Sequence, residues 1–463
     1  MSKLYVFGIG GTGSRVIKAL TMLLASGVKC NSTIVPVIID PDQDAADLTR
    51  ATEFMKLYIK IHNNSKFKDG KDCFFKTEIV QTVQNFRLPI DNTLNVKFSE
   101  FIGLKSLDDS SRALCEALFS QKNLDSDMKV GFKGNPNIGS VVLNQFSESQ
   151  IFKNIANSFQ QGDRIFIISS IFGGTGASGF PLLLKNLRTN DQIPNHSLIN
   201  NAKIGAITVL PYFSLKSDSE SEIDSSTFIS KTKSALGYYE KNISSNNSLD
   251  TLYYIGDNLT NALDNCEGGK EQKNPAHLIE LVSALAILDF EKADLPEYTQ
   301  TVHKEFGVIN DNSTLTFSDL ATETNKTIQQ RLVQMFLFVK YLKTTLQSQI
   351  SYQPWAKKRK IAKSFLDSEF YKNVTMFSDS YAEWLKEMAQ TQRTFLPFVE
   401  GRQTDVFEMV NGILPNSSRF KSYALLDDLL NAENDDKNTK SDEQFLELFE
   451  NATKNAVSKK FNF

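Results

Sequence analysis

The sequence predicts an α/β fold in which a Rossmann-like parallel sheet is followed by a mainly helical C-terminal region. Three observations predict it. Apolar, strand-like runs alternate with helical patterns through the first half of the chain. A glycine-rich turn directly follows two of these runs, at "FGIGGTGSR" (7–15) and "FGGTGASGFP" (172–181). Residues 321–463, in contrast, contain few alternating apolar runs and are almost wholly helical in pattern.

The strands and helices of the first half follow one another in regular order. The predicted strands are "KLYVFGI", "TIVPVIID", "RIFIISSI", "AKIGAITVLPYF" and "LDTLYYIGDN". The predicted helices are "GSRVIKALTMLLASG", stretches around 42–60 and 106–120, a helix that starts with "GFPLLLKNLR", and "STFISKTKSALGYYEKN". Because the strands are apolar on both faces, we expect helices to cover both sides of the sheet.

The second half of the chain is predicted to be helical. "NPAHLIELVSALAILDF" is a long apolar central helix, and "KTIQQRLVQMFLFVKYLKTTL" and "YAEWLKEMAQ" are the clearest helices after it. The 463 residues exceed the size of a typical single core. We therefore expect a sheet domain over 1–265, a central helix with a candidate catalytic loop over 266–320, and a mainly helical domain over 321–463.

Composition and charge favour neither a nucleic-acid nor a membrane partner. The 51 basic and 54 acidic residues leave a net charge of −3, and the basic run "KKRK" at 357–360 is typical of a solvated surface. No run reaches the roughly 18 apolar residues of a membrane span, and "MSKLYVFGIGG" is no secretory signal, so a cytoplasmic protein is expected. The cysteines lack CxxC spacing, which predicts reduced thiols and no metal site.

The first glycine turn fits more than one kind of site. Gly8, Gly10 and Gly13 match the G-x-G-x-x-G spacing, which lets backbone N–H groups approach a phosphate at a helix N-terminus. Asp40, at the end of the second strand, stands where a dinucleotide enzyme places its ribose-binding acid. Taken alone, this turn favours a dinucleotide, and a plain strand-to-helix turn is the alternative.

The second glycine turn changes this interpretation. Residues 173–179 form another donor-rich turn after a strand and before a helix. A dinucleotide's single pyrophosphate is normally held by one such turn, whereas a triphosphate requires donors around three groups. Neither turn is a Walker A loop, because no G-K-[ST] follows. Two converging turns therefore indicate a nucleoside triphosphate.

Six motifs in this chain resemble the tubulin/FtsZ superfamily. "FGGTGASGFP" resembles the tubulin signature, the phosphate loop of tubulin and of the division protein FtsZ. "FGIGGTGSRVI", "VIIDPDQDAADL" and "GNPNIGS" are similar to the first FtsZ loop, the second strand with its loop, and the loop over the γ-phosphate. "ITVLPYF" and "LDTLYYIGDN" are similar to the segments that precede the ribose and base contacts. Over residues 1 to about 260, the resemblance implies the nucleotide domain of a divergent bacterial tubulin-like protein.

The resemblance also implies a ligand and its contacts. GTP or GDP would bind, with Mg²⁺ beside the phosphates, and Asp42 would face the metal or the β-phosphate. Glu220 or Glu222 would reach the ribose. Asn258, with Asp257, would read the guanine, although these two residues would also suit a simple turn. The residues that would contact the phosphates are Gly10, Gly11, Thr12 and Gly13 (α and β), Gly134, Asn135 and Pro136 (γ), and Gly173, Gly174, Thr175, Gly176, Ala177, Ser178 and Gly179 (the whole chain of phosphates).

Hydrolysis in the resembled family takes place between subunits, where an acidic loop after the central helix positions water at the neighbour's γ-phosphate. "STLTFSDL" at 313–320 is the best match to that loop, with Asp319 as the catalytic acid. Thr314 and Thr316 stand where the family has Asn and Asp, so hydrolysis is expected to be slow or absent. "GVINDN", with Asp311, is an alternative placement, and Asp319 would also suit the first turn of a helix.

Three functions are compatible with these motifs. The first is a GTP-binding protein that self-assembles into filaments in a nucleotide-dependent way and is a slow, assembly-dependent GTPase. The second is a nucleotide-gated interaction module or scaffold, such as one of a bacterial defence system, with weak or no hydrolysis. Its helical C-terminal region would bind an unknown protein partner. The third, a dinucleotide or adenylating enzyme using "GIGGTGSR", leaves the second glycine turn and "GNPNIG" unexplained.

Overall fold

The structure is a computed structural model of the chain. It describes residues 2–42, 44–68, 70–91, 93, 96–128, 131–132, 134–215, 228–257, 262–263, 269–271, 273–295, 300–305, 312–399, 405–416, 423–433, 440–461 and 463.

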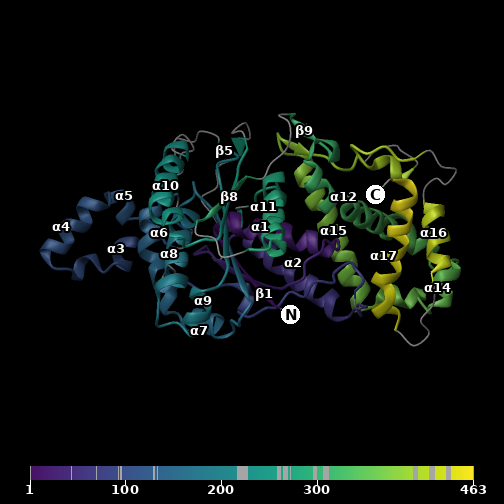
Figure 1. Cartoon of the computed structure of the whole chain (residues 1–463), viewed down its shortest axis with the longest axis horizontal. Coiled ribbons are helices and arrows are strands. Elements are labelled where there is room, and N and C mark those ends of the chain that lie inside the picture. Colours follow the sequence, from purple (N-terminus) through teal and green to yellow (C-terminus); the bar gives the residue numbers. More distant parts are fainter. Residues whose placement is uncertain are drawn as a thin grey trace.

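A parallel sheet of six strands, in the order β2-β1-β3-β4-β6-β8, forms the centre of the first half (Figure 1). Every neighbouring pair is parallel. Five of these strands are those predicted from the sequence, and β8 was not expected because "VHKE" alternates between half-buried and exposed residues at the sheet edge. The strands are β1 (Lys3–Ile9), β2 (Thr33–Ile39), β3 (Arg164–Ser170), β4 (Ile204–Val209), β6 (Thr251–Ile255) and β8 (Val302–Glu305).

Helices cover both faces of this sheet, as the apolar strands predict (Figure 1). Helix α1 leads from β1 to β2 and α8 leads from β3 to β4, in opposite directions along the sheet. Since crossovers between parallel strands are right-handed, these two helices lie on opposite faces. Helices α2 and α11 pack beside α1, whereas α6 packs beside α8. Helix α10 also lies on the α8 side, where Tyr239 contacts Phe180 with ring centroids 5.2 Å apart. The bounds are α1 (Gly10–Ala25), α2 (Ala46–Asn63), α6 (Pro136–Leu143), α8 (Gly174–Thr189), α10 (Phe228–Asn242) and α11 (Leu278–Lys292).

The C-terminal region is a bundle of helices, which confirms the helical prediction. It packs against α2, where the rings of Phe54 and Phe377 are 5.2 Å apart. Phe338 of α12 packs on Phe449 of α17 inside the bundle. In the basic run at 357–360, Arg359 is only 4% exposed and donates to the Glu433 carbonyl, so this residue is not solvated as expected. The helices are α12 (Thr322–Tyr341), α13 (Gln347–Gln349), α14 (Pro354–Lys358), α15 (Glu369–Ala389), α16 (Tyr423–Ala432) and α17 (Ser441–Lys460).

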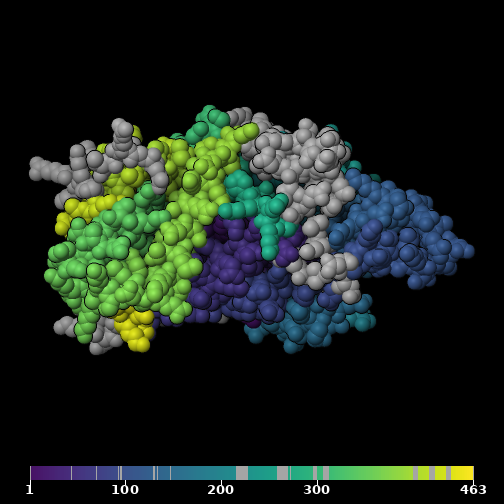
Figure 2. Space-filling model, turned by 180° about the vertical axis from the view of Figure 1, so that it is seen from behind, coloured from purple at the N-terminus to yellow at the C-terminus, as the bar shows by residue number. Residues whose placement is uncertain are grey.

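A small lobe projects from the opposite end of the molecule (Figures 1 and 2). An antiparallel bridge between Lys97 and Asp127 closes its base. The predicted helix around 106–120 is confirmed here as α4. The lobe contains α3 (Phe98–Phe101), α4 (Asp109–Leu118) and α5 (Gln121–Leu124). The remaining short elements are α7 (Gln150–Asn157), α9 (His196–Asn200), β5 (Ser214–Leu215), β7 (Ala262–Leu263), β9 (Thr314–Leu315) and β10 (Thr394–Phe395).

Candidate functional site

The candidate site lies at the carboxyl ends of β1 and β3. These strands are neighbours, and the chain leaves them toward opposite edges of the sheet, which opens a crevice typical of ligand sites in parallel sheets. Strand β1 ends at Ile9 and α1 begins at Gly10, while α8 begins at Gly174, four residues after Ser170 ends β3. The second glycine segment is therefore mostly the start of α8, because the helix begins before the predicted "GFPLLLKNLR".

The two glycine turns meet in this crevice. Gly10 has a left-handed φ of +71°, and a Cβ added to it would lie 3.4 Å from the Cβ of Thr175. A Cβ on Gly131 would lie 3.9 Å from Cγ of Pro41 and 4.0 Å from Oγ1 of Thr175. A Cβ on Gly174 would lie 2.9 Å from the backbone nitrogen of Asn135. The structure thus brings together the segments around residues 10, 41, 134 and 175, which the sequence places far apart.

The chemistry of these turns suits a chain of phosphates. Neither Ile9, which precedes α1, nor Gly173, which precedes α8, makes a side-chain cap, and the first turn of each helix has no acidic residue. The N–H groups of an uncapped helix start carry partial positive charge and bind anions. A Cβ on Gly11 would approach only Nη1 of Arg15, at 3.7 Å, so the backbone is open there. Two such helix starts beside one crevice would hold several phosphates through backbone N–H groups.

The segment expected beside the γ-phosphate is held by its own cap and by a lysine. The side chain of Asn135 caps α6 by accepting from the N–H groups of Asn137 and Ile138, and Pro136 occupies the first turn. Nζ of Lys231, on α10, donates to the Gly134 carbonyl at 3.0 Å. Sequence reasoning missed Lys231, since a single lysine within a helix carries no motif.

A buried ion-pair network lies directly behind the first turn. Arg15 donates from Nε to Oε1 of Glu280 (2.6 Å), from Nη1 to Oδ2 of Asp47 (3.0 Å) and from Nη2 to the Tyr212 hydroxyl (2.8 Å). Burial raises the pKa of the Glu280 carboxyl, and the guanidinium opposes that shift. The network joins α1, α2, the segment after β4 and α11, and it was not predicted because its members are up to 265 positions apart.

Asp42 is held by backbone groups. Oδ2 accepts from the Gly269 N–H at 2.6 Å, and Oδ1 accepts from the Asp44 N–H at 3.1 Å. Burial raises the pKa of the neighbouring Asp40 carboxyl to about 7. Within the described part of the chain, no group of three His, Cys, Asp or Glu side chains is placed to hold a metal ion. The observed bonds of Asp42 order its loop, and its role toward a metal or the β-phosphate stays a prediction.

The residues expected at the ribose and base are only partly described. Glu220, Glu222 and Asn258 lie outside the described residues. Asp257 pairs with Arg393, which comes from the C-terminal region, at 3.0 Å. Next to this pair, a cavity of about 140 Å³ lies between Tyr212, His277 and the segment 390–392. The C-terminal region therefore contacts the segment that follows β6 within the same chain.

Asp319 is the acid of a capping box. Its Oδ2 accepts from the backbone N–H and the hydroxyl of Thr316, at 2.7 and 2.8 Å, at the start of a short 3₁₀ turn. Strand β8 lies between α11 and this turn, so the turn does not directly follow the central helix. Asp311 lies outside the described residues. The capping role that the sequence offered as an alternative is present, and a role on a neighbouring subunit stays a prediction.

Comparisons with known proteins find similarity in the fold. No family model and no curated protein sequence matches the chain. Among solved structures, CetZ from Methanosaeta thermophila strain DSM 6194 matches with 16% identity and a TM-score of 0.34, over 65% of this chain and 56% of that one. An empty FtsZ dimer of M. jannaschii matches with 16% identity and a TM-score of 0.28, over 62% and 53%. A GTPγS-bound protofilament of CetZ2 from Haloferax volcanii matches with 11% identity and a TM-score of 0.32, over 73% and 72%.

The chain is similar to CetZ and FtsZ in its fold, an α/β fold with a parallel sheet, and it spans about half the length of the first of these structures. Among the described residues, no helix is long and apolar enough to cross a membrane.

Proposed function

We propose that this protein binds a guanine nucleotide at the crevice between β1 and β3 and self-assembles in a nucleotide-dependent way. One observation carries the proposal: the uncapped starts of α1 and α8 converge beside the segment at Gly134. Two helix starts supply backbone N–H groups from two directions, which suits a triphosphate better than the single pyrophosphate of a dinucleotide. The motifs at these turns resemble tubulin and FtsZ, which supports guanine as the base.

Hydrolysis of GTP is proposed to occur where two copies meet. Asp319 is half-buried on a turn of the C-terminal half, and it is the acid that the resemblance assigns to the neighbour's γ-phosphate. In this role its carboxylate would orient the attacking water rather than form a covalent bond. Mg²⁺ would bind through the phosphates and neutralise part of their charge.

The test is turnover of GTP and ATP as a function of protein concentration, with sedimentation of the same samples. The proposal predicts that GTP turnover per molecule rises with concentration and that pelleting requires GTP. Binding of GTP without turnover or pelleting at any concentration would reject assembly-dependent hydrolysis.

A nucleotide-gated interaction module is the second candidate function. It is favoured by the hydrogen bonds that hold Asp319 to its own Thr316, since a carboxylate engaged in its own chain is less free to orient water. It is also favoured by Arg393, which joins the C-terminal region to the end of β6 in the nucleotide domain through Asp257. Nucleotide binding would then change how the helical bundle presents itself to a protein partner.

A further inference from the structure

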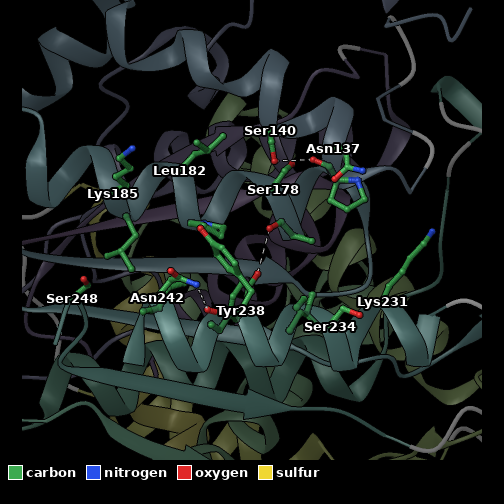
Figure 3. Close-up of a pocket in the computed structure, with 18 of the residues that line it drawn as sticks. Asn137, Ser140, Ser178, Leu182, Lys185, Lys231, Ser234, Tyr238, Asn242 and Ser248 are labelled. Atoms are coloured by element: carbon green, nitrogen blue, oxygen red, sulfur yellow. Dashed lines mark hydrogen bonds between the residues drawn. The ribbon is translucent and has the colours of Figure 1, made fainter. Parts of the chain in front are cut away.

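A groove of about 900 Å³ lies between α8 and α10, on the face of the sheet away from the C-terminal bundle. Its floor is apolar and buried, and includes Ile171, Leu184 and Ile243. Figure 3 shows side chains of both helices along its length, with Leu182 and Lys185 on α8 and Ser234 and Tyr238 on α10. Phe180 of α8 and Tyr239 of α10 are in contact, so the groove lies to one side of this contact. The groove is therefore a surface depression that can accommodate a segment of a partner.

The rim of the groove is positively charged. Lys185 is exposed on the α8 side, and Lys231 lies near the end formed by Pro136 and Asn137. Arg188 also contributes, although its guanidinium is 3.6 Å from the Asp250 carboxylate. Among the described residues that line the groove, there is no aspartate or glutamate. An apolar helix that carries acidic residues would complement both the floor and the rim.

Helix α4 of the projecting lobe has these properties. None of its side chains is buried, and Leu114 and Leu118 are 60% and 63% exposed. With Ala113 and Ala117, they form an apolar stripe at helical spacing that faces solvent, whereas Arg112 on another face is half-buried. An amphipathic helix normally turns its apolar stripe inward. The outward stripe on α4 is therefore available to a partner.

We propose that α4 of one copy docks into the groove between α8 and α10 of a second copy. The ten residues of α4 span about 15 Å, which is shorter than the roughly 22 Å spanned by the fifteen residues of α10 along one side of the groove. The acidic Asp109 and Glu116 lie along one side of the apolar stripe and are opposite in charge to the lysines at the rim. The lobe extends away from the body of its own chain (Figures 1 and 2).

This contact does not require hydrolysis, and one end of the groove adjoins the proposed nucleotide site, because Pro136, Gly173, Ala177 and Ser178 line both. A single short helix in a groove buries on the order of 1,000 Å², which is at the low end for specific interfaces. The contact alone therefore gives weak association. It strengthens any assembly that a second contact supports, because the second binding event becomes intramolecular.

The first experiment measures association of the full chain by analytical ultracentrifugation, without nucleotide and over a range of concentrations. The Leu114→Gln/Leu118→Gln variant keeps helix-forming residues and is expected to weaken the dissociation constant at least about tenfold. Leu414→Gln is the matched control, since Leu414 is 91% exposed elsewhere and its change should leave association unaltered. A monomer at every concentration, or equal association of both variants, would overturn the proposal.

The second experiment uses charge reversal in trans. Glu116→Lys and Lys185→Glu are each expected to weaken self-association. A mixture of the two variants should restore it, because the new lysine on α4 of one copy then meets the new glutamate in the groove of the other. Lys60→Glu, an exposed change on α2, is the control that should neither weaken nor restore association. Failure of the mixture to recover overturns the pairing of α4 with the groove. Repeating the experiment on the mixture with GTP tests the proposed function separately, because docking of α4 into the groove does not require GTP.

Discussion

Nε of Arg15 donates to Oε1 of Glu280 across 2.6 Å, and this buried ion pair joins α1 to α11 directly behind the first glycine turn. Removing one partner of a buried pair leaves the other charge uncompensated. Arg15→Met leaves Glu280 without its guanidinium and Asp47 with only that of Arg50 at 3.7 Å, and should therefore lower the free energy of unfolding by about 3–5 kcal/mol.

Glu280→Gln is the matched change, because the amide oxygen still accepts from Arg15. It should cost only about 1 kcal/mol. Urea unfolding of both variants checks the difference. Equal and small losses would mean that the network contributes little to holding α1 against α11.

The glycines of the first turn should separate nucleotide binding from folding. A Cβ on Gly11 would approach only Nη1 of Arg15, at 3.7 Å, whereas a Cβ on Gly13 would lie 2.4 Å from the carbonyl carbon of Gly8. Gly11→Val should therefore keep the melting temperature and weaken GTP binding at least about tenfold, since its side chain would occupy the phosphate crevice. Gly13→Ala should lower the melting temperature by forcing the backbone apart. Calorimetric binding and thermal unfolding of both variants make the comparison.

His277 should make stability depend on pH. Burial, together with Arg15 and Arg393, lowers the pKa of His277 from 6.5 to about 4. Between pH 4 and pH 6.5 the unfolded chain binds a proton at His277 that the folded chain does not. The free energy of unfolding is therefore undiminished by His277 above pH 6.5, and it decreases as the pH falls toward 4. The loss is up to about 3 kcal/mol.

His277→Asn should remove this loss while still capping α11, because Asn is a good N-cap residue. The pH dependence of the wild type alone does not isolate His277, because the raised pKa of Asp40 increases the free energy of unfolding as the pH falls from 7 to 4. The difference between wild type and variant removes the contribution of Asp40. The measurement is urea unfolding of wild type and variant across this pH range. Parallel stability curves for the two proteins would contradict the assignment to His277.

Asp319 and Thr316 separate a catalytic role from a structural one. Asp319→Ala removes both the carboxylate and the capping box, and should slow GTP turnover without weakening nucleotide binding. Thr316→Ala breaks the hydroxyl contact but keeps the carboxylate, and should retain turnover while losing about 1 kcal/mol of stability. Equal slowing by the two changes in single-turnover assays would show that Asp319 acts only as a cap.

The sequence was sufficient to predict the sheet and its two glycine turns, because glycines after apolar runs are a strong local signal. Strand β8 was missed since an edge strand with one exposed face lacks the apolar run of the central strands. The start of α8 at Gly174 was missed because glycine is a poor helix former, and here its lack of a Cβ permits the close approach to Asn135.

The network of Arg15 and the contact of Lys231 with Gly134 could not be predicted. Both join residues that are about a hundred or more positions apart, and only the topology of the sheet brings them together. The same topology places Asp257 against Arg393, which a local turn pattern cannot reveal. Long-range charge pairing therefore accounts for most of the site that the motifs did not indicate.

The most direct test of the central claim is titration calorimetry of GTP, GDP and ATP into the wild-type chain and into Gly11→Val. If a guanine nucleotide binds at the crevice between β1 and β3, we expect one GTP per chain, weaker binding of ATP, and loss of GTP binding in Gly11→Val at an unchanged melting temperature. Absence of saturable binding of any of these nucleotides to the folded wild-type chain, or equal GTP binding by Gly11→Val, would contradict it.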